Sequence, residues 1–310
     1  MRDIPWAGEL EERLGRSVDD MHLVPGGASK EAWAVESGGE RLLVRRAGGG
    51  VIHEATLSLE HEFRMLEIAY EAGVKAPHPV AYLGELGGRE AFAMEFVAGE
   101  TIGRRIVREP PPGLSLELAD ELAKIHAIPH ERAPFLQAGD ILARFEHELD
   151  SVGEPHPAIE YGLWWLREHR PEPLADVVNH GDFRIGNVVV SEQGLESLLD
   201  WEFAHLSDPR EDLAWPLVRA WRFGADEKRL GGIGAVEPYL ERYVELTGHE
   251  IEIDDLYWWE VLGNVKWAIG ALTQSRRHLT GQDRSVEYAV LGRLAAEMEY
   301  ELLDLIEKAA

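Results

Sequence analysis

The chain has 310 residues, of which 57 are Asp or Glu and 31 are Lys or Arg, so its formal charge is −26 with His neutral. This charge excludes a protein that coats nucleic acid, because phosphate backbones are held by clustered Lys and Arg and the sequence has no basic run longer than a pair. The absence of Cys excludes disulfides, thiolate metal sites and cysteine nucleophiles.

The same features favour certain partners and one compartment. A strong negative charge favours a cationic substrate, or phosphates that a metal ion has already neutralised. The first residues contain no apolar signal core, and no stretch approaches the roughly 20 apolar residues of a membrane span. We therefore expect a cytoplasmic protein with no nucleic-acid or membrane partner, whose oligomeric state the sequence does not indicate.

The first third of the chain, up to residue 98, has the pattern of short strands around one helix. Apolar or β-branched runs are separated by Gly-Gly pairs that suit hairpin turns. The predicted strands are residues 22–24, 32–36, 41–45, 80–83 and 91–97, and the predicted helix covers residues 53–72. The pattern predicts an antiparallel sheet with one helix.

After Gly99 the pattern changes to long amphipathic segments, in which apolar residues recur every three or four positions. The predicted helices cover residues 116–128, 141–152, 158–167, 212–223, 236–246, 254–278 and 285–308. Between residues 177 and 200 they are interrupted by a short apolar run, a Gly-containing turn and two further short strands at 188–190 and 198–199. This predicts an α+β fold with a small lobe, residues 1–98, and a larger, mainly helical lobe, residues 99–310. Ligands favour the cleft between two such lobes.

The strongest chemical signal is the segment HGDFRIGN at residues 180–187, followed after two short strands by LDWE at residues 199–202. Phosphoryl transfer from a nucleotide needs a carboxylate that faces the attacking hydroxyl and oxygen ligands that hold metal on the β- and γ-phosphates. Asp182 and Asn187 supply part of that set, and Asp200 supplies the rest from the neighbouring hairpin. The protein-kinase catalytic loop, H-R-D-x-x-x-x-N, has the same order, with Arg in place of Gly181.

These motifs resemble those of the aminoglycoside phosphotransferase and choline kinase-like superfamily, whose loop reads H-G-D-x-x-x-x-N and whose second motif reads I/L-D-W/F-E. Three further segments match it in the same order: VPGGAS at 24–29, LAKIH at 122–126 and DPREDLAW at 208–215. The combination looks most like a bacterial phosphotransferase group that is also found fused to acyl-CoA dehydrogenases. The resemblance implies a two-lobe protein-kinase-like fold.

In the large lobe, the resemblance makes Asp182 the catalytic residue that orients and deprotonates the acceptor hydroxyl. It makes Asn187 and Asp200 the ligands of Mg²⁺. The alternative for Asp182 is an Asx-turn residue that caps the loop. His180 is expected to brace the loop by hydrogen bonds, and Asp212 to fix its shape by accepting backbone N–H bonds.

In the small lobe, Arg45 stands where the superfamily has a phosphate-binding Lys. Its permanent charge and its ability to grip two oxygens suit the phosphates of a nucleotide. The expected ion-pair partner is Glu62, with Glu60 or Glu67 as alternatives; the other interpretation of Glu62 is a solvated surface charge.

Two backbone segments complete the nucleotide site that the resemblance implies. The turn that contains Gly27 and Ser29 is expected to place N–H groups and a hydroxyl over the phosphates. The backbone of Met94, Glu95 and Val97, at the junction of the lobes, is expected to bind the purine edge.

The sequence thus predicts a small-molecule kinase that transfers the γ-phosphoryl group of ATP or GTP to a hydroxyl of a small acceptor, with Mg²⁺. An aminoglycoside O-phosphotransferase and a catalytically silent nucleotide-binding module stay open as alternatives, although a silent module usually loses one of Asp182, Asn187 and Asp200. A metal-dependent hydrolase is disfavoured because a second cluster of His ligands is missing.

The acceptor site is expected to be lined by the segment 257–277, which has only one acidic residue, Glu260. Its apolar residues include Trp258, Trp259, Val265, Trp267, Ile269 and Leu272. Such a lining favours an acceptor with apolar surface over a polycationic aminoglycoside.

Overall fold

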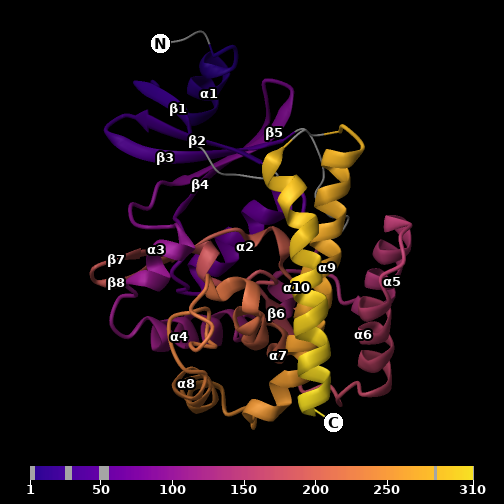
Figure 1. Cartoon of the computed structure of the whole chain (residues 1–310). Coiled ribbons are helices and arrows are strands. Elements are labelled where there is room, and N and C mark those ends of the chain that lie inside the picture. Colours follow the sequence, from indigo (N-terminus) through magenta and orange to yellow (C-terminus); the bar gives the residue numbers. More distant parts are fainter. Residues whose placement is uncertain (1–3, 25–29, 49–55, 283–284, 310) are drawn as a thin grey trace.

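The computed structural model describes residues 4–24, 30–48, 56–282 and 285–309, and one end of it is a five-stranded antiparallel sheet with the strand order β1-β2-β3-β5-β4 (Figure 1). The strands are β1 (Asp20–Val24), β2 (Lys30–Ser37), β3 (Glu40–Ala47), β4 (Pro79–Leu86) and β5 (Arg89–Glu95). Each predicted strand corresponds to one of these, although β5 begins and ends two residues earlier than expected.

Two of the predicted Gly-Gly turns close hairpins of this sheet. Gly38 and Gly39 join β2 to β3 with φ angles of 59° and 81°, and Gly87 and Gly88 join β4 to β5 with φ angles of 57° and 73°. A left-handed backbone at both central positions is what a tight hairpin with the normal strand twist requires. The third pair, which includes Gly27, lies outside the described residues.

A helix covers each face of the sheet. Helix α1 (Ala7–Leu14), which the sequence pattern did not predict, buries Leu10 against one face. Helix α2 (Leu59–Glu71) buries Phe63 and Leu66 in the main core, between the sheet and the helical part of the molecule. The predicted start of this helix at residue 53 is wrong, because Ser58 ends the extended chain and caps α2 by accepting the N–H of His61.

The rest of the chain is mainly helical. Its helices are α3 (Gly103–Arg108), α4 (Leu114–His126), α5 (Ile141–Val152), α6 (Pro157–Glu168), α7 (Pro209–Ala214), α8 (Glu237–Thr247), α9 (Tyr257–Leu279) and α10 (Val286–Ala309). Helices α9 and α10 run side by side from the sheet to the far end of the molecule (Figure 1). Within the part of the chain that the structure describes, no helix is long and apolar enough to span a membrane.

The predicted helix over residues 212–223 is wrong. Helix α7 ends at Ala214 and is followed by two 3₁₀ turns, Trp215–Leu217 and Arg219–Arg222. Pro216 has no N–H to continue an α-helix, and Phe223 ends the segment with a φ of 50°. The indole of Trp215 is thereby turned toward the loop at residues 180–187.

Two small antiparallel pairs sit among the helices and carry the chemical motifs. Strand β6 (Val177–Asn179) pairs with β9 (His205–Ser207), and β7 (Val188–Ser191) pairs with β8 (Gly194–Leu198). Short 3₁₀ turns lie at His130–Arg132, Ile185–Asn187, Trp201–Phe203 and Ile253–Leu256. The motif HGDFRIGN therefore connects β6 to β7, and LDWE connects β8 to β9.

The sheet and the helical part meet just after β5. Glu100 exchanges backbone hydrogen bonds of 2.8 and 3.1 Å with Val190 of β7. A Cβ on the preceding Gly99 would lie 2.5 Å from the side chain of Val189, so only glycine allows this close approach. The division into lobes of residues 1–98 and 99–310 remains our proposal.

Candidate active site

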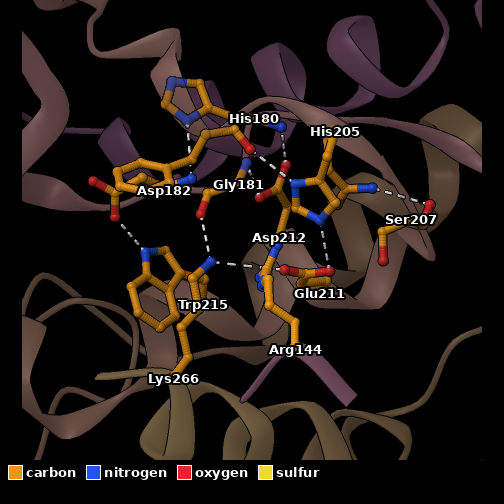
Figure 2. A network of polar contacts seen from close by, with 12 residues as sticks. Arg144, His180, Gly181, Asp182, His205, Ser207, Glu211, Asp212, Trp215 and Lys266 are labelled. Carbon is orange, nitrogen blue, oxygen red and sulfur yellow. Dashed lines mark hydrogen bonds and ion pairs between the residues drawn. The ribbon is translucent and has the colours of Figure 1, made fainter. Parts of the chain in front are cut away.

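The loop after β6 is held from behind by one carboxylate. Asp212 on α7 accepts the N–H groups of His180 at 2.6 Å and Gly181 at 2.9 Å (Figure 2). Burial alone would raise the pKa of Asp212, but its hydrogen bond and charge interaction with His126 hold it below its usual range. The prediction that Asp212 fixes the loop by accepting backbone N–H bonds is confirmed.

His180 braces the loop against the second motif. Its Nε2 lies 3.0 Å from the carbonyl oxygen of Leu199, and its Nδ1 accepts the N–H of Asp182 at 3.2 Å. Burial lowers the pKa of the ring, so the neutral tautomer with a proton on Nε2 satisfies both contacts. This is the bracing that the sequence predicts.

Gly181 has no room for a side chain. Its φ is 77°, and an added Cβ would lie 2.2 Å from the carbonyl oxygen of Phe203. The position that holds Arg in protein kinases is therefore closed to any larger residue here. The carbonyl oxygen of Gly181 instead accepts a hydrogen bond of 2.7 Å from Nζ of Lys266 on α9 (Figure 2).

Three donors fix the carboxylate of Asp182. Its Oδ1 accepts the indole N–H of Trp215 at 2.7 Å and the Nε–H of Arg184 at 3.0 Å. Its Oδ2 accepts Nδ2 of Asn187 at 2.5 Å. A carboxylate held by several donors and facing a cavity can orient a hydroxyl group and accept its proton.

Asn187 and Asp200 line the same cavity, and Asn187 is hydrogen-bonded to Leu199, the residue before Asp200. The amide nitrogen of Asn187 is used by Asp182, and its backbone carbonyl accepts the N–H of Leu199 at 2.8 Å. Asp200 has a φ of 63°, which non-glycine residues rarely adopt and which is typical of functional sites. The fold thus brings an amide and a carboxylate to one cavity, and the oxygens of both groups are of the kind that a hard divalent cation prefers.

Arg45 and Glu62 meet as predicted, but each has a second partner. Arg45 Nε lies 3.6 Å from Glu62 Oε1, and its Nη1 forms an ion pair with Asp200. Burial would raise the pKa of Asp200, and the charge of Arg45 holds it low. The alternative partner Glu67 is excluded, because it pairs with Arg64 on the surface of α2.

Lys30 on β2 is a residue of this site that sequence reasoning missed. Its ammonium pairs with Glu62 and lies 2.7 Å from Oε2 of Glu202. Burial raises the pKa of Glu202, and the charge of Lys30 opposes the shift. The sequence places Lys30 and Ala32 on the same face of a strand, because they are two residues apart. Only the register of the sheet, in which Ala32 pairs with Arg45, brings Lys30 to this site.

A second missed group lies beneath the loop. Glu211 stands between His205, whose Nε2 is 3.0 Å away, and Lys266, at 3.7 Å (Figure 2). The other ring nitrogen of His205 faces the carbonyl oxygen of Phe203 at 2.8 Å, so both nitrogens have acceptors. Although burial opposes it, Glu211 raises the pKa of His205 above its usual value.

One cavity of about 860 Å³ joins these residues. Among the residues that line it are Lys30, Arg45, Met94, Asp182, Asn187, Asp200, Glu202, His205 and Lys266. Of the three residues expected to bind the purine edge, Met94 lines the cavity and Val97 does not. The N–H of Glu95 already donates a hydrogen bond to the carbonyl oxygen of His78. Gly27 and Ser29 lie outside the described residues.

The prediction of which residues line the acceptor side is partly wrong. Helix α9 presents Lys266, Trp267, Gly270 and Gln274 to the cavity, and these positions form one stripe along the helix. Trp258, Trp259, Val265 and Ile269 are buried in the core instead. The aromatic groups on this side come from several elements and include Phe145, Trp215, Trp221, Trp267 and Tyr288.

A sheet with one helix on its inner face, a helical region beyond it and a cavity between them that holds Asp182, Asn187 and Asp200 are features of the protein-kinase-like fold. A family model described as the phosphotransferase enzyme family matches residues 20–246. The chain belongs to this family.

Similar proteins agree with this assignment. The chain is 26% identical to mouse (Mus musculus) acyl-CoA dehydrogenase family member 10 over 88% of its own length, but it spans only 28% of that protein. A structure from Ralstonia eutropha JMP134, provisionally named an aminoglycoside phosphotransferase, superposes with a TM-score of 0.79 at 20% identity and covers 98% of both chains. Spectinomycin phosphotransferase in complex with ADP and spectinomycin superposes with a TM-score of 0.67 at 15% identity, over 96% of this chain and 98% of the other. The two superpositions show the shared fold.

Proposed function

We propose that the chain is a Mg²⁺-dependent small-molecule kinase that transfers the γ-phosphoryl group of ATP or GTP to a hydroxyl of a small acceptor. The observation that carries this proposal is that Asp182, Asn187, Asp200 and Arg45 line the same cavity although they come from three separate segments, the loop after β6, the segment after β8 and strand β3. The presence of ADP in the structure of spectinomycin phosphotransferase, which shares the fold, supports a nucleotide as the donor.

The donor set fits Mg²⁺. The amide nitrogen of Asn187 is used by Asp182, which leaves its amide oxygen for a cation, and the carboxylate of Asp200 supplies a second hard oxygen. Among the described residues no group of three or more His, Asp or Glu could hold a metal by itself. Mg²⁺ is commonly held by one or two protein oxygens together with phosphates, and when bound it neutralises charge on the transferred group.

The residues of the chain itself have distinct roles in this reaction. Arg45 binds phosphate oxygens and is kept in place by Glu62. Asp182 orients the acceptor hydroxyl and accepts its proton on a carboxylate oxygen as the hydroxyl oxygen bonds to the γ-phosphorus. The bond between that phosphorus and the β,γ-bridging oxygen breaks, and ADP or GDP leaves. Asp212 and His180 hold the loop in the geometry that this attack needs.

The cavity favours an acceptor with apolar surface. Trp215, Trp221 and Trp267 all line the cavity; Trp215 donates a hydrogen bond to Asp182, and the ring of Trp221 contacts those of Trp215 and Trp267. Arg144 and Lys266 accompany Glu148 and Glu287 there, so the lining does not concentrate negative charge as binding of a polycation would need. We therefore expect aminoglycosides to be poor acceptors.

The test is a screen for acceptor-dependent release of ADP or GDP by the purified chain. The screen includes kanamycin, spectinomycin, choline, sugars, fructosamines and hydroxylated acyl compounds, with the Asp182→Asn variant as the control for each hit. Release that needs both an acceptor and Asp182 supports the proposal. Nucleotide binding without release for any acceptor would instead identify a silent module. A kcat/KM for kanamycin of about 10⁶ M⁻¹s⁻¹, in the ordinary range of roughly 10⁴–10⁸, would contradict our interpretation of the cavity.

A further inference from the structure

Lys30 is the one cation of the cavity that belongs to β2, and nothing in the catalytic motifs assigns it a role. We propose that Lys30 is a second phosphate-binding residue, which binds the phosphates of the nucleotide together with Arg45. This inference rests on the proposed nucleotide-dependent function and adds a specific residue to it.

The register of the sheet places Lys30 and Arg45 on one face. Ala32 of β2 pairs with Arg45 of β3, and Lys30 lies two positions before Ala32, so the three side chains point to the same side. Leu43 and Met94 are paired on the same face one step further into the sheet. All five residues line the cavity that contains Asp182 and Asp200.

Lys30 and Arg45 share one carboxylate of the site, that of Glu62. Glu62 is approached on Oε2 by Lys30 and on Oε1 by Arg45, and Arg45 also pairs with Asp200. Lys30 therefore stands at the helix α2 glutamate, the place that the sequence assigned to Arg45 alone. Lys30 and Arg45, which come from adjacent strands, are therefore both held at the carboxylate of Glu62, and Arg45 is held at that of Asp200 as well.

The chemistry of the ammonium group suits phosphate. Lysine offers three N–H donors from a compact charge, while arginine grips two oxygens in a plane. The ammonium group of Lys30 forms ion pairs with Glu62 and Glu202. The side chain of Lys30 is 10% exposed and lines the cavity. A triphosphate carries more negative charge than Arg45 alone neutralises, so a second cation on the same face strengthens its binding.

A purely structural role is the competing explanation, because Lys30 neutralises the buried Glu62 and Glu202. The two roles differ in what they predict for ligands. If Lys30 binds phosphate, its replacement raises the Kd for nucleotides and leaves the Kd for nucleosides unchanged. If Lys30 is only structural, its replacement changes the shape of the cleft and raises both Kd values equally.

The experiment is titration calorimetry of the wild-type chain and its Lys30 variants with ATP·Mg, GTP·Mg, adenosine and guanosine. For the triphosphate that the wild type binds, Lys30→Met is expected to raise Kd about tenfold or more, with the matching nucleoside changed less than about twofold. Lys30→Gln can still donate to the two carboxylates but has no charge, and it is expected to show the same selective loss. Lys30→Arg is expected to restore most of the affinity.

Lys124→Met is the matched control, because Lys124 on α4 pairs at 2.7 Å with Glu121, a buried glutamate that does not line the cavity. It is expected to leave both Kd values unchanged. Equal losses for triphosphate and nucleoside in Lys30→Gln, or no loss in either, overturn the inference alone. A wild-type chain that binds neither ATP·Mg nor GTP·Mg overturns the proposed function and this inference with it. If Lys30→Met fails to fold, as thermal unfolding would show, Lys30→Gln decides the question.

Discussion

Lys266 on α9 donates a hydrogen bond of 2.7 Å to the backbone carbonyl oxygen of Gly181, which immediately precedes Asp182. The ammonium also lies 3.7 Å from Glu211 and over the ring of Trp215, whose indole N–H holds the Asp182 carboxylate. One side chain from a long helix therefore supports the loop backbone and contacts a residue that orients the proposed catalytic group.

Replacing Lys266 with Met is expected to lower kcat about tenfold or more, because a charge-assisted hydrogen bond to the loop is lost and Glu211 loses one of its cations. The Kd for nucleotide should change little, since Arg45 and its partners are untouched. Steady-state kinetics and calorimetry measure the two quantities. Lys308→Met, which removes a surface pair with Asp304 on α10, is the control. A kcat within twofold of wild type would reject this positioning role.

Asp182→Asn is expected to reduce kcat by about 10²–10⁴-fold, because the amide cannot accept the proton of the acceptor hydroxyl. ATP·Mg or GTP·Mg should bind about as well as to wild type, since Asp182 faces the acceptor and not the nucleotide in the proposed geometry. Single-turnover kinetics and calorimetry test both parts. Turnover within tenfold of wild type would show that Asp182 only caps the loop.

Asp200→Ala is expected to remove most of the increase in nucleotide affinity that Mg²⁺ provides, because the carboxylate is the charged ligand of the proposed metal site. Titrations of ATP or GTP with Mg²⁺ and with a chelator measure this increase. Asp226→Ala, which removes a surface partner of Arg219, is the control and should keep the full Mg²⁺ effect. An undiminished Mg²⁺ effect in Asp200→Ala would refute the assignment.

A buried acid outside the cavity should make stability depend on pH. Burial raises the pKa of Glu260 to about 7, although Arg229 and Arg222 oppose the shift. Between the unfolded pKa, about 4.5, and pH 7 the folded chain then binds more protons than the unfolded chain, so the free energy of unfolding falls as pH rises through this window. The total effect is on the order of 3 kcal/mol, since one pKa unit corresponds to about 1.4 kcal/mol.

Glu260→Gln removes the titrating group and should flatten the curve between about pH 4.5 and 7, as urea unfolding at a series of pH values would show. The exposed Glu250→Gln is the control and should leave the curve as it is in wild type. An equally steep decline in Glu260→Gln would place the pH dependence in another group.

The sequence alone determined the parts of this protein that depend on local pattern and motif order. Short apolar or β-branched runs and Gly-Gly turns predicted the antiparallel sheet, and the segments at 180–187 and 199–202 predicted that Asp182, Asn187 and Asp200 share one site. Asp212 was also predictable as the support of the loop, because its spacing after Asp208-Pro209 matches the family motif. These features depend on residues that are close in sequence or fixed by a recurring hairpin.

The tertiary structure decided which side chains from distant parts of the sequence join the motif residues at the site. Lys30 reaches Glu62 only because β2 and β3 pair in one particular register. Lys266 and Glu211 meet under the loop because α7 and α9 pack together. Lys266 belongs to no motif, and Glu211 stands at a position of the 208–215 motif to which the resemblance assigned no role. The acceptor lining was mispredicted because the composition of α9 does not say which of its faces is turned to the core. That choice is made by the burial of apolar surface against neighbouring helices, which is a property of the whole fold.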